Sequence, residues 1–60
     1  MKMATNYIYW KTKRDKRFRK LGIGFKNERH AILEAVNIAK RGCDVKIKAN
    51  GKYWFDSRKI

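Results

Sequence analysis

The sequence has little of what small proteins use to reinforce a fold. Its 60 residues include a single cysteine, which excludes a disulfide within the chain. One cysteine and one histidine cannot complete the four ligands of a structural zinc site, so we expect no metal and no other cofactor. A chain this short buries only about 60% of the surface that it exposes when unfolded. Its stability must come from a small helix-on-sheet core, or in part from a partner.

Long hydrophobic runs are also missing. No apolar stretch approaches the roughly 18–20 residues that a helix needs to span a membrane. Residues 1–6 lack the apolar core of a signal peptide. A single free thiol without an export signal favours a reducing compartment, so we expect a cytoplasmic protein with no membrane partner.

The residue combinations that carry catalysis are absent as well. The five acidic residues are scattered, and Glu28 and Glu34 are too widely spaced to form a pair on one helix face. We expect His30 to support the helix start or lie on the surface, and Cys43 to be a small buried residue. Without an acid–base pair, a triad or a phosphate-binding glycine loop, we predict no enzyme activity. A ribonuclease that depends on His30 is the least implausible catalytic alternative.

Acidic residues are few beside the basic ones. Five Asp and Glu stand against 17 Lys and Arg, which gives a formal charge of +12. Self-repulsion at this density disfavours the compact state and argues for an anionic partner. Hydrophobic residues still make up 43% of the chain, so we expect one folded basic domain over residues 1–60. Its ends, residues 1–5 and 57–60, are predicted to fray.

Residues 43–56 predict a β-hairpin. The dipeptide Asn50-Gly51 suits the two positive-φ positions of a type I′ turn. Its flanks are rich in β-branched and aromatic residues, which favour strands. A two-residue loop then sets the register of the hairpin. The predicted cross-strand pairs are Ala49–Lys52, Lys48–Tyr53, Ile47–Trp54 and Lys46–Phe55.

Residues 6–25 predict another hairpin around the basic loop at residues 13–17. The loop has no Gly or Asn, so we expect four residues on a type I turn. Gly22 and Gly24 leave a bare patch, over which an aromatic neighbour or a ligand backbone can lie. The predicted pairs are Thr12–Arg17, Lys11–Phe18, Trp10–Arg19, Tyr9–Lys20, Ile8–Leu21 and Tyr7–Gly22.

Residues 26–42 predict the single helix. Asn27 suits the N-cap, Glu28 suits the positive helix start, and Gly42 suits the C-terminal end. Apolar residues recur at the spacing of one helix face. They are Ile32, Ala35, Val36 and Ala39, flanked by Ala31, Leu33 and Ile38.

The order β-β-α-β-β indicates an α+β fold, with one helix packed on one face of a four-stranded, mostly antiparallel sheet. The strand order stays open. Because side chains alternate along a strand, one sheet face is predicted to be apolar and to meet the helix. Its members are Ile8, Trp10, Leu21, Ile23, Phe25, Val45, Ile47 and Trp54. The outer face is predicted to mix rings with lysines: Tyr7, Tyr9, Lys11, Phe18, Lys20, Lys46, Lys48, Tyr53 and Phe55.

Rings and basic side chains on an open sheet are one way to hold nucleic acid. Stacking on an aromatic ring contributes about 1–3 kcal/mol per base, and lysines between the rings meet phosphates. We therefore predict a non-catalytic protein that binds DNA or RNA with weak sequence preference and strong salt dependence. The candidate phosphate contacts are Lys11, Lys13, Arg14, Lys16, Arg17, Lys20, Lys46 and Lys48. The candidate stacking residues are Tyr9, Phe18, Tyr53 and Phe55.

The outer face is also consistent with other partners. Tyr and Phe are enriched at protein interfaces, so the same face suits an acidic host protein bound by a small phage-type or mobile-element-type effector. An exposed aromatic sheet is compatible with a homodimer too. In the simplest alternative, the rings only cover lysine stems and the loop is a solvated turn.

Overall fold

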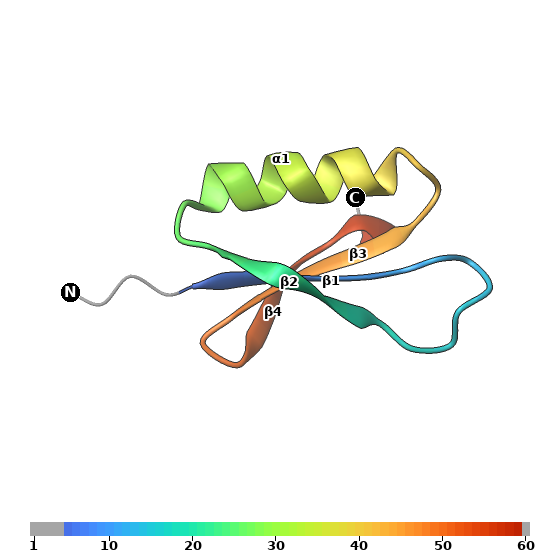
Figure 1. The fold of residues 1–60 in the computed structure, drawn as a ribbon, viewed down its shortest axis with the longest axis horizontal. Helices are drawn as coiled ribbons and strands as arrows, with labels where there is room; N and C mark the ends of the chain where they lie inside the picture. The colour runs from blue at the N-terminus through green and yellow to red at the C-terminus, as the bar shows by residue number, and fades with distance from the viewer. Residues whose placement is uncertain (1–4, 60) are drawn as a thin grey trace.

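The computed structural model describes residues 5–59 as one antiparallel sheet with a helix on one face (Figure 1). The elements are β1 (Asn6–Lys11), β2 (Arg19–Phe25), α1 (Glu28–Ala39), β3 (Asp44–Ala49), β4 (Lys52–Asp56) and a short 3₁₀ turn, η1 (Ser57–Lys59). The strand order is β2-β1-β3-β4, so β1 and β3 are central and β2 and β4 are edges. The predicted α+β class and β-β-α-β-β order are confirmed, and the open strand order is settled.

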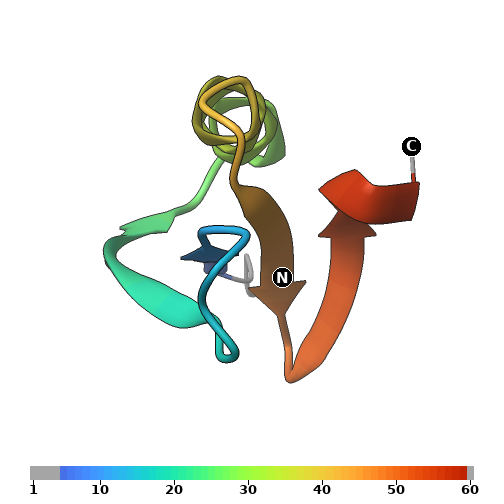
Figure 2. The same cartoon turned by 90° about the vertical axis from the view of Figure 1, so that its right-hand side faces the viewer.

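The helix begins where the sequence predicts. Asn27 is the N-cap, and its Oδ1 accepts a hydrogen bond from the backbone N–H of Arg29 at 2.8 Å. After the helix ends at Ala39, Gly42 has a φ of 92°, a left-handed conformation that favours glycine. Viewed end-on, α1 lies along one side of a curved sheet and leaves the other side uncovered (Figure 2).

The core between helix and sheet is small and aliphatic. Ile8 of β1, together with Val45 and Ile47 of β3, is fully buried against Ala31 and Ala35 of α1. The two alanines allow the helix backbone to approach the central strands closely. The predicted inward faces of β1 and β3 are therefore correct. Half-buried side chains surround this cluster: Trp10, Leu21, Phe25, Ile32, Ile38, Ala39 and Phe55.

A β-bulge in β2 changes one predicted face. Tyr7 lies opposite Gly24 instead of Gly22, so three residues of β2 stand opposite Ile8 alone. Ile23 lies within this bulge and is 58% exposed, so the prediction that it faces the core is wrong. The predicted Ile8–Leu21 and Tyr7–Gly22 pairs are wrong for the same reason. The observed pairs are Asn6–Phe25, Tyr7–Gly24, Tyr9–Lys20 and Trp10–Arg19, of which the last two were predicted.

The β3–β4 hairpin turns at the predicted dipeptide. Asn50 and Gly51 have φ angles of 53° and 75°, as a type I′ turn requires. Next to the turn the predicted pairs are observed, namely Ala49–Lys52 and Lys48–Tyr53.

Further along β4 the predicted register fails. Trp54 is the extra residue of a second bulge, so Ile47 pairs with Phe55 and Lys46 pairs with Asp56. Phe55 is half-buried and packs against the core cluster on the helix side. The prediction that Phe55 belongs to the outer face is therefore wrong. Trp54, predicted for the apolar face, is 40% exposed and is not part of the core cluster.

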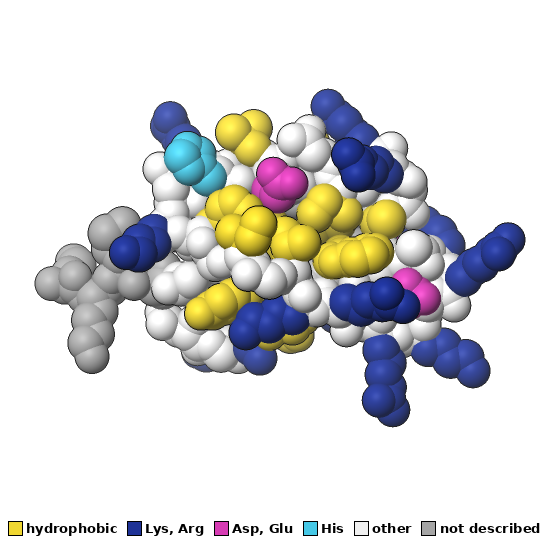
Figure 3. Space-filling model, viewed as in Figure 1, with side chains coloured by type: hydrophobic (Ala, Val, Ile, Leu, Met, Phe, Trp, Pro, Cys, Tyr) yellow, Lys and Arg dark blue, Asp and Glu magenta, His cyan; other side chains and the backbone are white. Residues whose placement is uncertain are grey.

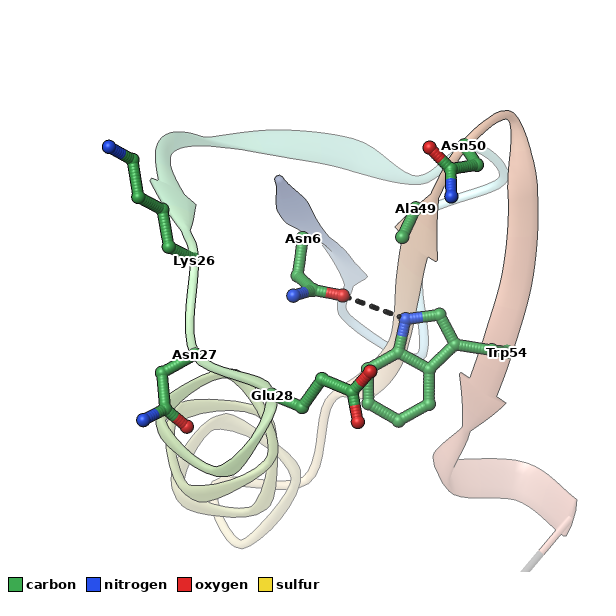
Figure 4. A pocket seen from close by; sticks show the side chains of 7 residues that line it. All are labelled: Asn6, Lys26, Asn27, Glu28, Ala49, Asn50 and Trp54. Carbon is green, nitrogen blue, oxygen red and sulfur yellow. Dashed lines mark hydrogen bonds between the residues drawn. The ribbon is translucent and has the colours of Figure 1, made fainter. Parts of the chain in front are cut away.

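A hydrogen bond to a buried side chain holds Trp54 at this bulge. The indole Nε1 of Trp54 donates to Oδ1 of Asn6 at 3.0 Å, and Asn6 is only 2% exposed. The Nδ2 of Asn6 donates in turn to the backbone carbonyl of Phe25 at 3.1 Å. Figure 4 shows the indole reaching from β4 toward Asn6, beside the start of α1. Asn6 thus ties β4 and the end of β2 to β1.

The end of the chain is fixed where fraying was predicted. The Oγ of Ser57 accepts a hydrogen bond from the backbone N–H of Val45 at 3.0 Å. Nη2 and Nε of Arg58 donate to the Asp56 carboxylate at 2.9 and 3.1 Å. These contacts hold residues 57–59 in η1, so their predicted fraying is wrong. The predicted fraying of residues 1–4 and 60 lies outside the described residues.

Candidate nucleic-acid interface

The sheet side away from α1 brings rings and lysines together. Because Ile8 and Ile47 are buried toward the helix, their neighbours in β1 and β3 point outward. Cross-strand pairing places Tyr7 beside Lys48 and Tyr9 beside Lys46. We call this surface the lysine face. Its members are Tyr7, Tyr9, Phe18, Lys20, Lys46, Lys48 and Tyr53.

Two lysines of the lysine face lie close over aromatic rings. The Nζ of Lys20 is 4.1 Å from the centroid of the Tyr7 ring. The Nζ of Lys46 is 4.5 Å from the Phe18 centroid and 5.0 Å from the Tyr53 centroid. Each such cation–π contact contributes about 0.5–1 kcal/mol at an exposed site. The rings therefore restrict where these ammonium groups lie.

The third lysine, Lys48, lies between two tyrosines. Its Nζ is 5.4 Å from the Tyr53 centroid and 5.9 Å from the Tyr9 centroid. The two tyrosine rings meet edge to face, with centroids 5.6 Å apart. The lysine face thus presents ammonium groups held over rings.

The predicted stacking residues differ in how open their rings are. Tyr53 is 50% exposed, whereas Tyr9 and Phe18 are half-buried and Phe55 lies on the helix side. A base that stacks on a ring beneath an ammonium group must first displace that group. Among these four residues Tyr53 is the most exposed, but Lys46 and Lys48 both lie over its ring, so a stacking base would have to displace them.

Gly24 accounts for the position of Tyr7. A Cβ placed on Gly24 would lie 3.3 Å from Cε1 of Tyr7 and 2.6 Å from Cγ2 of Thr5. The Tyr7 ring therefore covers this glycine, which is one of the two roles predicted for the bare patch. By contrast, a Cβ on Gly22 would meet no atom within 4 Å.

The basic loop extends beyond the sheet at the far end of β1 (Figure 1). The backbone N–H of Asp15 donates to the carbonyl of Thr12 at 3.2 Å, and the N–H of Thr12 donates to Oδ2 of Asp15 at 3.1 Å. The hydrogen bonds from Thr12 hold the pKa of the Asp15 carboxyl below its ordinary value. This turn makes the loop longer than predicted, spanning residues 12–18. The predicted pairs Lys11–Phe18 and Thr12–Arg17 do not form, since pairing of β1 with β2 stops at Trp10–Arg19.

Two predicted phosphate contacts are held by a carboxylate of the chain itself. Asp44 is 6% exposed, with its Oδ1 2.8 Å from Nζ of Lys13 and its Oδ2 3.2 Å from Nζ of Lys11. The hydrogen bond from Lys13, reinforced by the one from Lys11, holds the pKa of the Asp44 carboxyl below its ordinary value. Lys11 and Lys13 therefore fasten the loop to β3, and the one carboxylate of Asp44 offsets half of their combined charge.

The loop tip keeps its charge. Arg14, Lys16 and Arg17 are exposed and belong to none of the ion pairs formed within residues 5–59. Figure 3 shows several Lys and Arg side chains projecting from this end of the molecule. The loop tip, defined as these three residues, thus adds positive charge beside the end of the lysine face.

Arg58 is a residue of this surface that sequence reasoning missed. Its guanidinium carbon lies 5.4 Å from the centroid of the Phe18 ring, on which Lys46 also lies. Its hydrogen bond to Asp56 lowers the pKa of that carboxyl from 3.8 to about 2. The separation of only two residues between Asp56 and Arg58 could have indicated this ion pair. The sequence places Asp56 at a strand end and Arg58 in a tail predicted to fray, so no role was assigned to Arg58.

A hollow of about 550 Å³ beside Trp54 lies outside the lysine face (Figure 4). The amide of Asn6 in its wall is already engaged by Trp54 and Phe25. The remaining lining residues are Lys26, Asn27, Glu28, Ala49 and Asn50. The hollow opens on the helix side and adds nothing to the candidate interface.

The residues weighed for catalysis are not brought together. His30 is exposed on α1, and Cys43 is half-buried before β3. Across residues 5–59, no three His, Cys, Asp or Glu side chains gather in a way that could hold a metal ion. No helix in that range is long and apolar enough to cross a membrane.

Comparisons with protein families, with curated proteins and with solved structures give no significant match. Function is therefore inferred from the geometry of the lysine face and the loop tip.

Proposed function

We propose that this protein is a non-catalytic nucleic-acid-binding module that contacts the phosphate backbone through its lysine face and loop tip. One arrangement carries the proposal. Lys20, Lys46 and Lys48 lie over aromatic rings on one sheet face, and none forms an ion pair with a carboxylate within residues 5–59. The carboxylate opposite Lys46, that of Asp56, is paired with Arg58. Lysine meets phosphate as a point charge, and the counterions released from the polymer favour binding.

The layout of the cations favours a polymer over a small anion. Lys48 lies beside Tyr7 near the start of β1, Lys46 lies beside Tyr9, and the loop tip lies beyond the end of β1. The positive groups therefore follow the length of a molecule whose longest extent is 39 Å. Double-stranded DNA carries one negative charge per roughly 1.7 Å of its axis, so it can meet such a row along its whole length.

Weak sequence preference follows from the same residues. Apart from Arg58, whose guanidinium is engaged by the Asp56 carboxylate, this surface contains no Arg, Asn or Gln, the side chains that read base edges in pairs of hydrogen bonds. Contacts to phosphate fix position without reading sequence. Stacking on Tyr53 would add affinity that tolerates any base.

Fluorescence anisotropy tests the proposal, with labelled duplex DNA, single-stranded DNA and RNA of one mixed sequence over a series of salt concentrations. For duplex DNA we expect log K to fall linearly with log salt, by about 0.9 for each phosphate neutralised. The face variant Lys46→Ala/Lys48→Ala and the tip variant Arg14→Ala/Lys16→Ala/Arg17→Ala should both weaken binding. Each should also reduce the salt slope by about 1 for every phosphate that the variant no longer neutralises.

The matched control for the face variant is Lys26→Ala/Lys40→Ala. It removes the same charge from exposed residues that lie outside the lysine face and the loop tip. Affinity that is flat with salt, or that falls as much in this control as in the face variant, would contradict the proposal. The alternative partner, an acidic protein on the same face, predicts that Tyr53→Ala costs more affinity than Lys48→Ala, since buried rings dominate protein interfaces.

A further inference from the structure

The groove between α1 and the β2 side of the sheet has apolar side chains that this chain leaves partly uncovered. It is a hollow of about 250 Å³ lined by Trp10, Leu21, Glu34, Ile38, Arg41 and Cys43. Trp10, Leu21 and Ile38 pack on the core yet stay only half-buried. Figure 3 shows hydrophobic side chains gathered on this side, between helix and sheet, with an acidic side chain among them. Another molecule that covered the groove would remove these side chains further from water.

Two opposite charges border the groove. Glu34 lies in the middle of α1, and Arg41 follows the end of the helix. Both side chains are exposed, and neither joins an ion pair within residues 5–59. They are seven positions apart, which is about 10 Å at roughly 1.5 Å of rise per residue. Arg19 also borders the groove, with its guanidinium carbon 5.9 Å from the Trp10 centroid, but it lies 3.9 Å from the Asp15 carboxylate. The groove and its border are therefore close to neutral in a chain whose formal charge is +12.

We infer that the occupant of this groove is a second copy of the same chain. In the arrangement that we infer, the two grooves face each other across a two-fold axis perpendicular to α1, which makes the two helices antiparallel. Glu34 of each copy then faces Arg41 of the other, and Ile38 lies between them near the axis. The interface is self-complementary because the same surface supplies both the acidic and the basic member of each ion pair. The apolar side chains of each groove are covered by the other copy.

The position of the groove explains how such a basic chain can self-associate. The lysine face lies on the sheet side away from α1, so its charges do not enter the contact. When the axis runs through the helix layer and the sheet layer, the two lysine faces end on the same side of the dimer. A single nucleic acid could then contact both faces and offset their repulsion, a consequence that rests on the proposed function, whereas the groove contact does not.

Sedimentation equilibrium with charge-exchanged variants tests this inference, at about 0.15 M salt, where charges beyond roughly 8 Å are screened. The wild type, with a monomer mass of 7.2 kDa, is expected to approach twice that mass as its concentration rises. Glu34→Arg and Arg41→Glu should each remain at the monomer mass, because each places like charges across the axis. The double variant Glu34→Arg/Arg41→Glu should associate again.

Lys40→Glu is the matched control, since it changes the charge as Arg41→Glu does but lies outside the groove. It should dimerise like the wild type, and circular dichroism should show every variant folded. A wild type that stays monomeric to about 1 mM would overturn the inference and leave the groove to a different partner. Equal association by both single variants would overturn it too. The monomeric variants should still bind nucleic acid with a salt slope, so failure here is separable from failure of the proposed function.

Discussion

At the scale of single residues, Asn6 does more than its position near the chain start suggests. Its buried amide accepts from Trp54 in β4 and donates to the carbonyl of Phe25 at the end of β2. A buried amide that hydrogen-bonds to groups on two different strands fixes the relative positions of those strands. If the strands moved apart, each group would lose its hydrogen bond in a place where water could not replace it.

We predict that Asn6→Ala lowers the free energy of unfolding by about 1–3 kcal/mol, the cost of leaving buried polar groups unpaired. Urea denaturation followed by tryptophan fluorescence measures it. Asn37→Ala, at an exposed position on α1, should show no loss of stability. Equal losses in the two variants would show that Asn6 does not tie the strands together.

Single contacts also decide which predicted site residues keep a free charge. The sequence identifies the lysines and rings correctly as residue types, and it places Tyr9, Lys20, Lys46, Lys48 and Tyr53 on one face. It does not reveal that Asp44 engages Lys13 from 31 positions away. That contact depends on the pairing of β1 with β3, which a strand order left open from sequence could not supply.

At the scale of elements, alternation predicts the faces of a strand only as far as the strand is regular. β1 and β3 pair in unbroken register, and their predicted faces are correct. Extra residues interrupt β2 and β4, and there the predictions for Ile23 and Phe55 fail. The bulge at Trp54 is accompanied by a hydrogen bond to a residue 48 positions away, which no local pattern contains. The Asn50-Gly51 turn, by contrast, depends on its own two residues and was predictable.

The turn gives a second prediction. Gly51 has a φ of 75°, so Gly51→Ala should destabilise the protein by about 1–2 kcal/mol, the cost of a left-handed residue with a Cβ. Gly22→Ala is the control, because its Cβ would meet no atom within 4 Å and its φ is not in the left-handed range. That variant should be neutral or more stable by up to about 1 kcal/mol. Thermal denaturation of both variants would show whether the turn, rather than glycine content, sets the difference.

At the scale of the whole molecule, a charge of +12 on 60 residues means that the folded state repels itself. Only Asp15, Asp44 and Asp56 form ion pairs within residues 5–59. Screening should therefore weaken more repulsion than attraction as salt is added.

We predict that the melting temperature rises when sodium chloride increases from about 0.01 M to about 0.15 M, as the screening length falls from roughly 30 Å to 8 Å. Calorimetry without nucleic acid measures the change, with a neutral osmolyte of equal osmolality as the control. A melting temperature that falls would mean that the ion pairs outweigh the repulsion.

The two bulges have a consequence for behaviour at high concentration. Both lie on the outermost strands, while the inner two run straight. A bulged edge strand does not present a flat, regular row of unpaired backbone N–H and C=O groups to which further strands can add. Neither β2 nor β4 is therefore a template for fibril growth. Crowded solutions of this protein should form no amyloid, even where they associate in pairs.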